Sequence, residues 1–104
     1  IRMATLEGAK VLGLDDRTGS LEVGKQADLI RISLDAPRLH PIYDIYSMLV
    51  YATMPTDVVS TMVAGKWLMR DRQVQTIDTE KAMADFLQAA RMFKINMAKL
   101  DIGT

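Results

Sequence analysis

The chain has 104 residues, 49% of them hydrophobic and 25% charged, a composition that is typical of a folded globular protein with one compact domain. This length leaves no room for a (β/α)8 barrel, which needs roughly 250 residues. Thirteen basic residues balance thirteen acidic ones and cysteine is absent, so we expect no nucleic-acid partner and a reducing compartment, the cytoplasm. No stretch approaches the roughly 20 apolar residues that a membrane span requires, so we expect no membrane partner either.

The first predicted element is a helix over residues 2–12. Met3 and Leu6 begin its apolar period, and Gly13 is placed to end it. Ile1 enters this helical pattern with no capping residue before it, which favours a chain that is entered within an element.

Residues 27–34 are predicted to form a half-buried strand. The alternation places Ile30 and Ile32 on one face and Arg31 on the other, wetter face. Two prolines then interrupt regular structure, so residues 35–41 are expected to form a loop.

The central part of the sequence predicts a helix and then a hairpin. Residues 43–52 have a helical period, with Asp44 as the cap or first-turn acid. Residues 58–64 and 66–70 are two apolar runs rich in strand-forming side chains. The dipeptide Ala64-Gly65 lies where a two-residue hairpin turn requires positive φ angles.

A short strand over residues 74–76 and a long helix complete the predicted elements. Asp78 is expected to cap this helix, and Glu80 is an acid in its first turn. An apolar stripe with spacings of three and four follows, formed by Met83, Phe86, Ala90, Phe93, Met97 and Leu100. Two interpretations remain open: the helix docks on its own domain, which its short length favours, or it binds a partner or a second copy, as a coiled-coil seam does.

Candidate catalytic and ligand-binding residues are few. Hydrolytic metal sites need several converging His, Cys or carboxylate ligands, and the sequence holds a single histidine, His40. As a general base His40 would lack an orienting residue and a nearby nucleophile, so a structural or surface role is favoured. We therefore assign no catalytic, cofactor-binding or metal-binding residue to this sequence, and no cofactor.

Three other features could suggest a binding site, but a structural explanation is favoured for each. The pair Asp15-Asp16 is read as a solvated turn, because adjacent side chains point apart. The glycines at 19 and 24 have the wrong spacing for a phosphate-binding loop or a dinucleotide fingerprint. The tyrosines at 43, 46 and 51 lack interleaved basic residues, so packing explains them better than base stacking.

Four stretches together resemble the C-terminal end of an amidohydrolase-superfamily enzyme. The stretch 4–14 (ATLEGAKVLGL) is similar to the last barrel helix of that family, and 18–34 to its turn and returning strand. Residues 41–52 look like the branch that contains methylthioadenosine and S-adenosylhomocysteine deaminases and triazine chlorohydrolases. Residues 57–66 resemble the closing hairpin of the composite β-sandwich, whereas Arg31 and Glu7 depart from the usual pattern.

The resemblance implies an α+β fold with three parts in one C-terminal domain, 1–104. These parts are the last barrel helix (1–14), sandwich strands with the middle helix and hairpin (15–76), and the C-terminal helix (77–104), without the catalytic barrel. In the intact family, zinc or iron bound by barrel residues activates water to hydrolyse C–N or C–Cl bonds on purine- or triazine-like rings. The resemblance thus implies a non-catalytic portion, inactive alone, whose partner is the missing barrel. The alternative is an assembly module that pairs with copies of itself as a homo-oligomer or with a larger protein.

Overall fold

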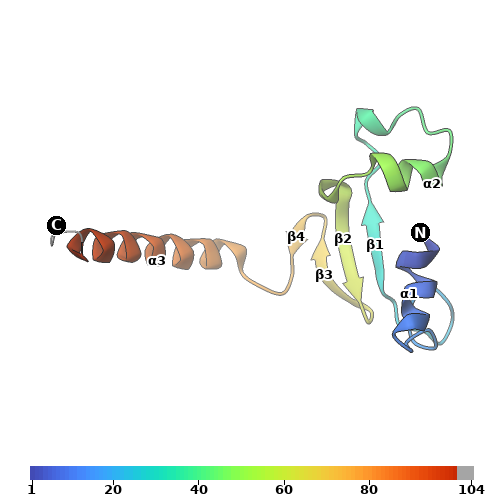
Figure 1. The fold of residues 1–104 in the computed structure, drawn as a ribbon, viewed down its shortest axis with the longest axis horizontal. Helices are drawn as coiled ribbons and strands as arrows, with labels where there is room; N and C mark the ends of the chain where they lie inside the picture. The colour runs from blue at the N-terminus through green and yellow to red at the C-terminus, as the bar shows by residue number, and fades with distance from the viewer. Residues whose placement is uncertain (101–104) are drawn as a thin grey trace.

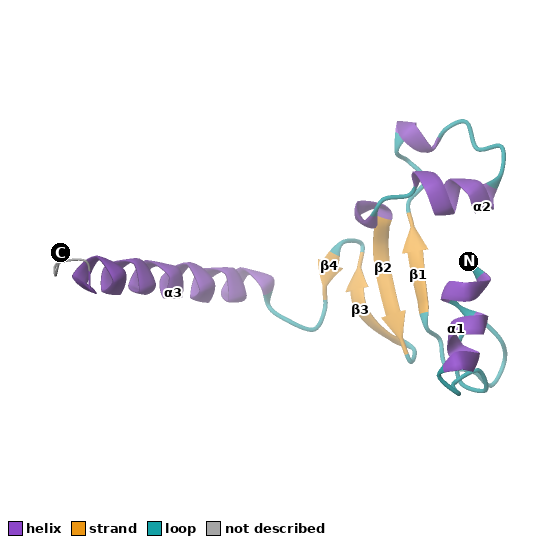
Figure 2. Ribbon diagram, in the orientation of Figure 1, coloured by secondary structure: helices purple, strands orange, loops and turns teal. Residues whose placement is uncertain are grey.

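The computed structural model describes residues 1–100, apart from the side chain of Leu100, and it has mixed helix and sheet. Four antiparallel strands form one sheet in the order β1-β2-β3-β4: β1 (Leu29–Ile32), β2 (Val58–Val63), β3 (Lys66–Arg70) and β4 (Gln73–Val74). Helix α1 (Leu6–Val11) lies beside the β1 edge, and α2 (Ile45–Ser47) lies beyond the end of β1 (Figure 1). Helix α3 (Thr79–Leu100) projects away from the sheet on the β4 side (Figure 2). The predicted α+β class, with an antiparallel sheet and a long C-terminal helix, is confirmed.

The predicted first helix is divided at Thr5. A 3-10 turn covers Arg2–Ala4, and α1 begins at Leu6. The Thr5 hydroxyl donates to the carbonyl of Ile1 at 3.0 Å, and this local bond competes with a continuous helical ladder. The predicted stop at Gly13 is confirmed, because its φ of +67° allows the amides of Gly13 and Leu14 to bond back to the last turn of α1.

Strand β1 is shorter than predicted, and on its predicted buried face Ile32 is half-buried whereas Ile30 is exposed. Ile30 is 57% exposed, and the pairing of β1 with β2 shifts between Arg31 and Ile32. Such an irregularity interrupts strict alternation, so period two does not fix both faces of this strand. Arg31 is exposed as expected, and it forms an ion pair with Asp71 in the turn after β3.

The predicted hairpin is confirmed. Ala64 and Gly65 both have positive φ angles, 49° and 75°, between β2 and β3. A second two-residue turn, Asp71-Arg72, also has positive φ angles and leads into β4 at 73–74, slightly before the predicted 74–76. The amide of Arg72 donates to the carbonyl of Val59 at 2.8 Å, which ties this second turn to β2.

The middle helix begins at Ile45 instead of residue 43 and changes its winding within a turn. Asp44 caps it, as predicted, by accepting from the amide of Tyr46 at 3.1 Å and the hydroxyl of Ser47 at 2.7 Å. These bonds hold the pKa of Asp44 below its ordinary value, the Ser47 bond having the larger effect. Residues Met48–Ala52 continue as a π-helical turn, a rare form that occurs mostly as a single turn within helices.

Helix α3 is capped as predicted but does not dock on its own chain. The Asp78 carboxylate accepts from the Lys81 amide at 3.0 Å. Every residue from 79 to 99 is exposed, including Phe86 and Phe93 at 66% each. The interpretation that this helix packs on its own domain is therefore wrong, since no described part of the chain covers the stripe. The position of Leu100 in the stripe falls outside the residues whose side chains are described.

The chain has little core for its size. Its accessible surface is 8663 Å² and its radius of gyration is 20.8 Å. A compact monomer of this mass exposes about 5,800 Å² and has a radius of gyration of about 13 Å. Among the described residues, the buried hydrophobic side chains are Ala9, Leu39 and Met48. No described helix is long and apolar enough to cross a membrane.

Candidate functional site

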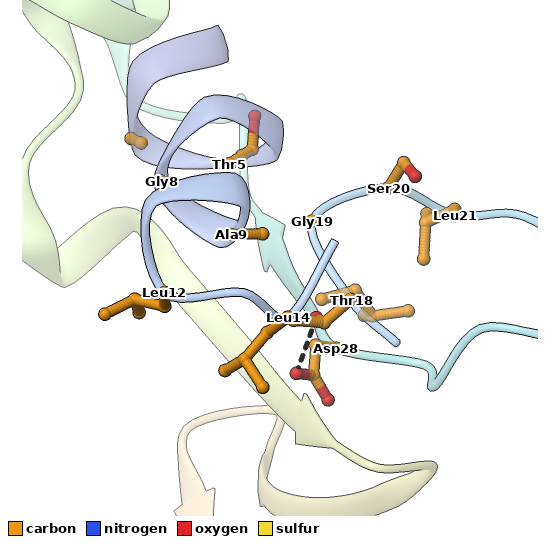
Figure 3. A pocket seen from close by; sticks show the side chains of 12 residues that line it. Thr5, Gly8, Ala9, Leu12, Leu14, Thr18, Gly19, Ser20, Leu21 and Asp28 are labelled. Atoms are coloured by element: carbon orange, nitrogen blue, oxygen red, sulfur yellow. Dashed lines mark hydrogen bonds between the residues drawn. The ribbon is translucent and has the colours of Figure 1, made fainter. Parts of the chain in front are cut away.

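An open groove lies between α1, the turn at 18–21 and the entry to β1. It encloses about 520 Å³, and its walls are mostly apolar, with a few hydroxyl groups and one carboxylate, Asp28 (Figure 3). The turn is brought here because α1 ends at Val11, Gly13 follows with a positive φ, and the chain reverses through the exposed residues Asp15 and Asp16. The hollow is an open groove whose apolar wall is fit for packing against another element.

Gly19 allows the turn to approach α1 closely. Its φ is +95°, and a Cβ there would lie 2.8 Å from the Cβ of Ala9 and 3.1 Å from the Cα of Leu6. The first distance is one that real Cβ atoms essentially never show and the second is tighter than most real contacts, so only glycine fits without movement of the helix or the turn. Ala9 is buried at this contact, and it is one of the few hydrophobic side chains that are.

Asp28 joins three segments that are distant in the sequence. One carboxylate oxygen accepts from the Thr18 hydroxyl at 2.8 Å (Figure 3), and the other accepts from the Ala64 amide at 2.7 Å. The Ala64 bond, followed by the Thr18 bond, holds the pKa of Asp28 below its ordinary value. The carboxylate is therefore fixed as a charged structural acceptor linking the turn, β1 and the hairpin, and it is poorly suited to accept a proton as a general base.

A second carboxylate, Asp57, is buried and lies at the opposite end of β2. Asp57 is 7% exposed and forms a two-oxygen ion pair with Arg38. It also accepts from the Met54 amide at 2.8 Å. The Arg38 bond is the main cause of a lowered pKa for Asp57. A further bond, from the Ser33 amide to the Asp57 carbonyl at 2.8 Å, attaches the end of β1 to this point.

The structure does not bring the sequence candidates together. His40 is exposed, and its Nε2 lies 2.7 Å from the carbonyl oxygen of Leu34. Asp15 and Asp16 are exposed turn residues, as predicted. The tyrosines do not pack as predicted, because Tyr43, Tyr46 and Tyr51 are 93%, 66% and 87% exposed.

Sequence reasoning missed the linking roles of Asp28, Arg38 and Asp57. The signal for Asp28 was its position at the entry to a strand. No spacing rule joins Arg38 to Asp57, which follows 19 positions later.

The side chains present do not fit a hydrolytic metal centre. Within residues 1–100, no three His, Cys, Asp or Glu side chains converge in the way that a metal ion requires. The carboxylates of Asp28 and Asp57 already bond to protein donors. A metal at this chain would have to be bound by residues other than these.

Comparison with known proteins assigns the family. Residues 1–68, more than half of the chain, match the model of the family described as "Amidohydrolase family". The chain belongs to the amidohydrolase family. This confirms the relationship that the four stretches indicated, including the deaminase branch suggested by residues 41–52.

The relatives are deaminases, and the chain matches a limited part of each. It is 47% identical over 83 residues to 5-methylthioadenosine/S-adenosylhomocysteine deaminase 1 of Syntrophus aciditrophicus, covering 80% of this chain and 19% of that protein. It is 38% identical over 91 residues to the corresponding deaminase of Thermoanaerobacter pseudethanolicus, covering 88% of this chain and 21% of the relative. The chain therefore spans about a fifth of the length of these amidohydrolases.

A solved structure has the same arrangement. An adenosine deaminase from Xanthomonas campestris, crystallised with bound zinc, superposes with a TM-score of 0.75 at 38% identity. The match covers 90% of this chain and 21% of the deaminase chain. The elements of this amidohydrolase chain therefore have a counterpart within a zinc-containing deaminase.

Proposed function

We propose that these residues form the C-terminal, non-catalytic portion of a metal-dependent amidohydrolase of the deaminase or chlorohydrolase type. Such an enzyme would hydrolyse C–N or C–Cl bonds on purine- or triazine-like rings. The observation that carries the proposal is the match to the zinc-containing deaminase, which includes 90% of this chain but 21% of the deaminase. In this proposal α1 is the last helix of the barrel, and the sheet is part of the composite sandwich.

The exposed apolar surface supports a role beside a larger body. The total accessible surface exceeds that of a compact monomer by about 2,900 Å². The groove beside α1 has an apolar wall, and Ile30 on the edge strand β1 is 57% exposed. Surfaces of this kind mark interfaces, so we propose the catalytic barrel as the partner that covers them.

The chemical contribution of these residues would be positional. When bound in the barrel, the metal of such an enzyme supplies activated water for hydrolysis. The residues of this chain would hold α1 against the sheet through the Gly19 contact and the Asp28 bonds. They would thus fix the last barrel helix without contacting the reacting atoms.

A chimaera of a relative tests this proposal. In the Syntrophus aciditrophicus deaminase, the segment that matches this chain is replaced by the matching 83 residues of this chain. We expect the zinc-loaded chimaera to deaminate 5-methylthioadenosine at a kcat/KM within about tenfold of the parent enzyme, a barrier change of about 1.4 kcal/mol at most. The 104-residue chain alone is expected to release no ammonia. A flexible linker of equal length in the same place is the matched control, and it should abolish activity.

Two outcomes would contradict the proposal. One is a chimaera that folds, by circular dichroism, yet is as inactive as the linker control. The other is ammonia release, or one equivalent of tightly bound zinc, from the 104-residue chain by itself.

A second candidate function is an assembly module, which the uncovered α3 favours. Met83, Phe86, Phe93 and Met97 are each between 46% and 66% exposed on one side of the helix. We propose that such a module would meet a larger protein or copies of itself through this surface. Sedimentation of the purified chain over a range of concentrations would separate this candidate from a monomeric one.

A further inference from the structure

We propose that two copies of this chain associate through α3 as an antiparallel helix pair centred near Gln88. This inference rests on the second candidate function and names its occupant as a second copy. The α3 stripe, defined here as Met83, Phe86, Ala90, Phe93 and Met97, supplies the seam. All five residues are exposed in the single chain.

The sequence along α3 is divided by charge. The segment 78–85 holds Asp78, Glu80 and Asp85 with one lysine, whereas 86–100 holds Arg91, Lys94 and Lys99 and no acid. Two such helices side by side attract each other when they run in opposite directions and repel when they run in the same direction. Opposite directions also align the helix dipoles favourably.

The residues that flank the stripe fix the register. On one flank lie Glu80, Leu87 and Lys94, and on the other lie Ala82, Ala89 and Asn96, each set repeating every seven residues. In an antiparallel pair, like flanks face each other. Centring the pair near Gln88 places Glu80 opposite Lys94 of the second copy, twice by symmetry. A shift by one heptad, or a parallel arrangement, removes this pairing of Glu80 with Lys94.

The same register matches large side chains with small ones. It places Phe86 opposite Ala90 of the second copy, and Met83 opposite Phe93. The alanines of the second flank allow the two backbones to approach closely. The first turns of α3 already present an apolar hollow lined by Ile77, Thr79, Ala82, Met83 and Phe86. The second copy would fill this hollow with Met97 and Phe93.

The pairing is of the kind that a two-fold axis produces. Each copy offers the same surface, so the assembly closes at two chains. Helix α3 has 22 residues and a length of about 33 Å. It projects from the sheet (Figure 1), so most of its length is open to a second helix.

The first test compares two charged substitutions by sedimentation equilibrium. Phe86→Asp lies on the stripe, whereas Ile95→Asp lies on the opposite side of α3 and is the matched control; both side chains are exposed in the single chain, at 66% and 50%. We expect a concentration-dependent dimer for the unmodified chain and for Ile95→Asp, and a monomer for Phe86→Asp. A monomer at every concentration for the unmodified chain would overturn the pairing and favour cover of the stripe by the proposed barrel.

The second test exchanges the facing charges. Lys94→Glu brings two pairs of like charges together and is expected to weaken the dimer at least about fivefold at low salt. Adding Glu80→Lys to that variant should restore the affinity to within about twofold. Arg91→Glu makes the same charge change away from the flanks and should have little effect. This register would be overturned if Lys94→Glu leaves the dimer affinity unchanged, or if the double variant dimerises no more tightly than Lys94→Glu alone. Either result would leave an assembly role intact.

The third test measures direction. The sequence has no cysteine, so Gln88→Cys and Ile95→Cys each accept a single spin label. In the antiparallel pair, the labels at 95 lie about 21 Å further apart along the helix axis than those at 88. Equal distances for the two positions would indicate parallel helices and overturn the proposal. None of these results depends on activity of the deaminase chimaera, so the two proposals can fail separately.

Discussion

Replacing Gly19 by alanine is expected to lower the free energy of unfolding of this chain by about 2–4 kcal/mol. Two costs add. Alanine at a φ of +95° is strained, and its Cβ would lie 2.8 Å from the Cβ of Ala9 and 3.2 Å from the carbonyl oxygen of Thr5. Because α1 would have to separate from the turn, we also expect the Asp28–Thr18 bond to be lost. Urea unfolding followed by circular dichroism measures the loss of stability. Amide exchange at Ala9, whose amide bonds the Thr5 carbonyl, measures the opening of α1.

Gly24→Ala is the matched control for this substitution. Gly24 has a nearly identical φ of +91°, but nothing lies within 4 Å of the position of its Cβ. It should therefore show the backbone cost alone, about 1 kcal/mol. The difference between the two variants isolates the contact of Gly19 with α1. Equal losses would show that the turn does not pack on α1 in solution.

Asp57→Asn is expected to lower stability more than any other single carboxylate-to-amide change in this chain. Asp57 is buried, accepts from the Met54 amide, and pairs with Arg38 through both oxygens. An amide keeps the shape, but it removes the charge that pairs with Arg38 and replaces one acceptor oxygen by a donor. A lower urea midpoint with an unchanged slope is the expected result. Asp35→Asn is the control, because Asp35 is exposed and bonds the Ser33 hydroxyl.

The pH dependence of stability provides a second readout of Asp57. Its pKa is lowered in the folded chain from an ordinary value of 3.8, chiefly by the Arg38 hydrogen bond. In the unfolded chain this carboxyl binds a proton more readily, so stability falls as pH falls. The contribution is complete above the ordinary pKa, and it is lost as pH drops below 3.8 and through the folded-state pKa. The Asn variant should show a shallower decline of stability in this acid range. A slope equal to that of the unmodified chain would show that Asp57 is not paired in solution.

The local elements could be predicted because their causes are local. Positive φ angles at Ala64-Gly65, the stop at Gly13, and the caps at Asp44 and Asp78 each depend on residues within one turn of each other. The division of the first helix at Thr5 was missed because a hydroxyl bond to the Ile1 carbonyl leaves no trace in apolar periodicity. The exposure of Ile30 was missed because alternation predicts which side chains share a face of β1, but not whether another element covers that face.

The candidate site, like the fold, was predictable only in its local parts. Glycines and aspartates at turns and strand entries could be recognised in the sequence, but their partners could not. Asp28 meets Thr18 through a turn and Ala64 through a strand pairing, and Arg38 meets Asp57 across 19 positions. Such contacts depend on the path of the chain between them, which no short spacing encodes.

The sequence by itself determined the amidohydrolase relationship, the α+β class, the hairpin and the apolar stripe of α3, since periodicity, turn chemistry and family motifs are properties of neighbouring residues. Only the tertiary structure decided that the rest of residues 1–99 leaves this stripe uncovered, that Gly19 touches α1, and that two lowered-pKa carboxylates tie distant segments together. The physical reason is that an amphipathic pattern indicates that a face is apolar, whereas the three-dimensional path of the chain determines what packs against that face.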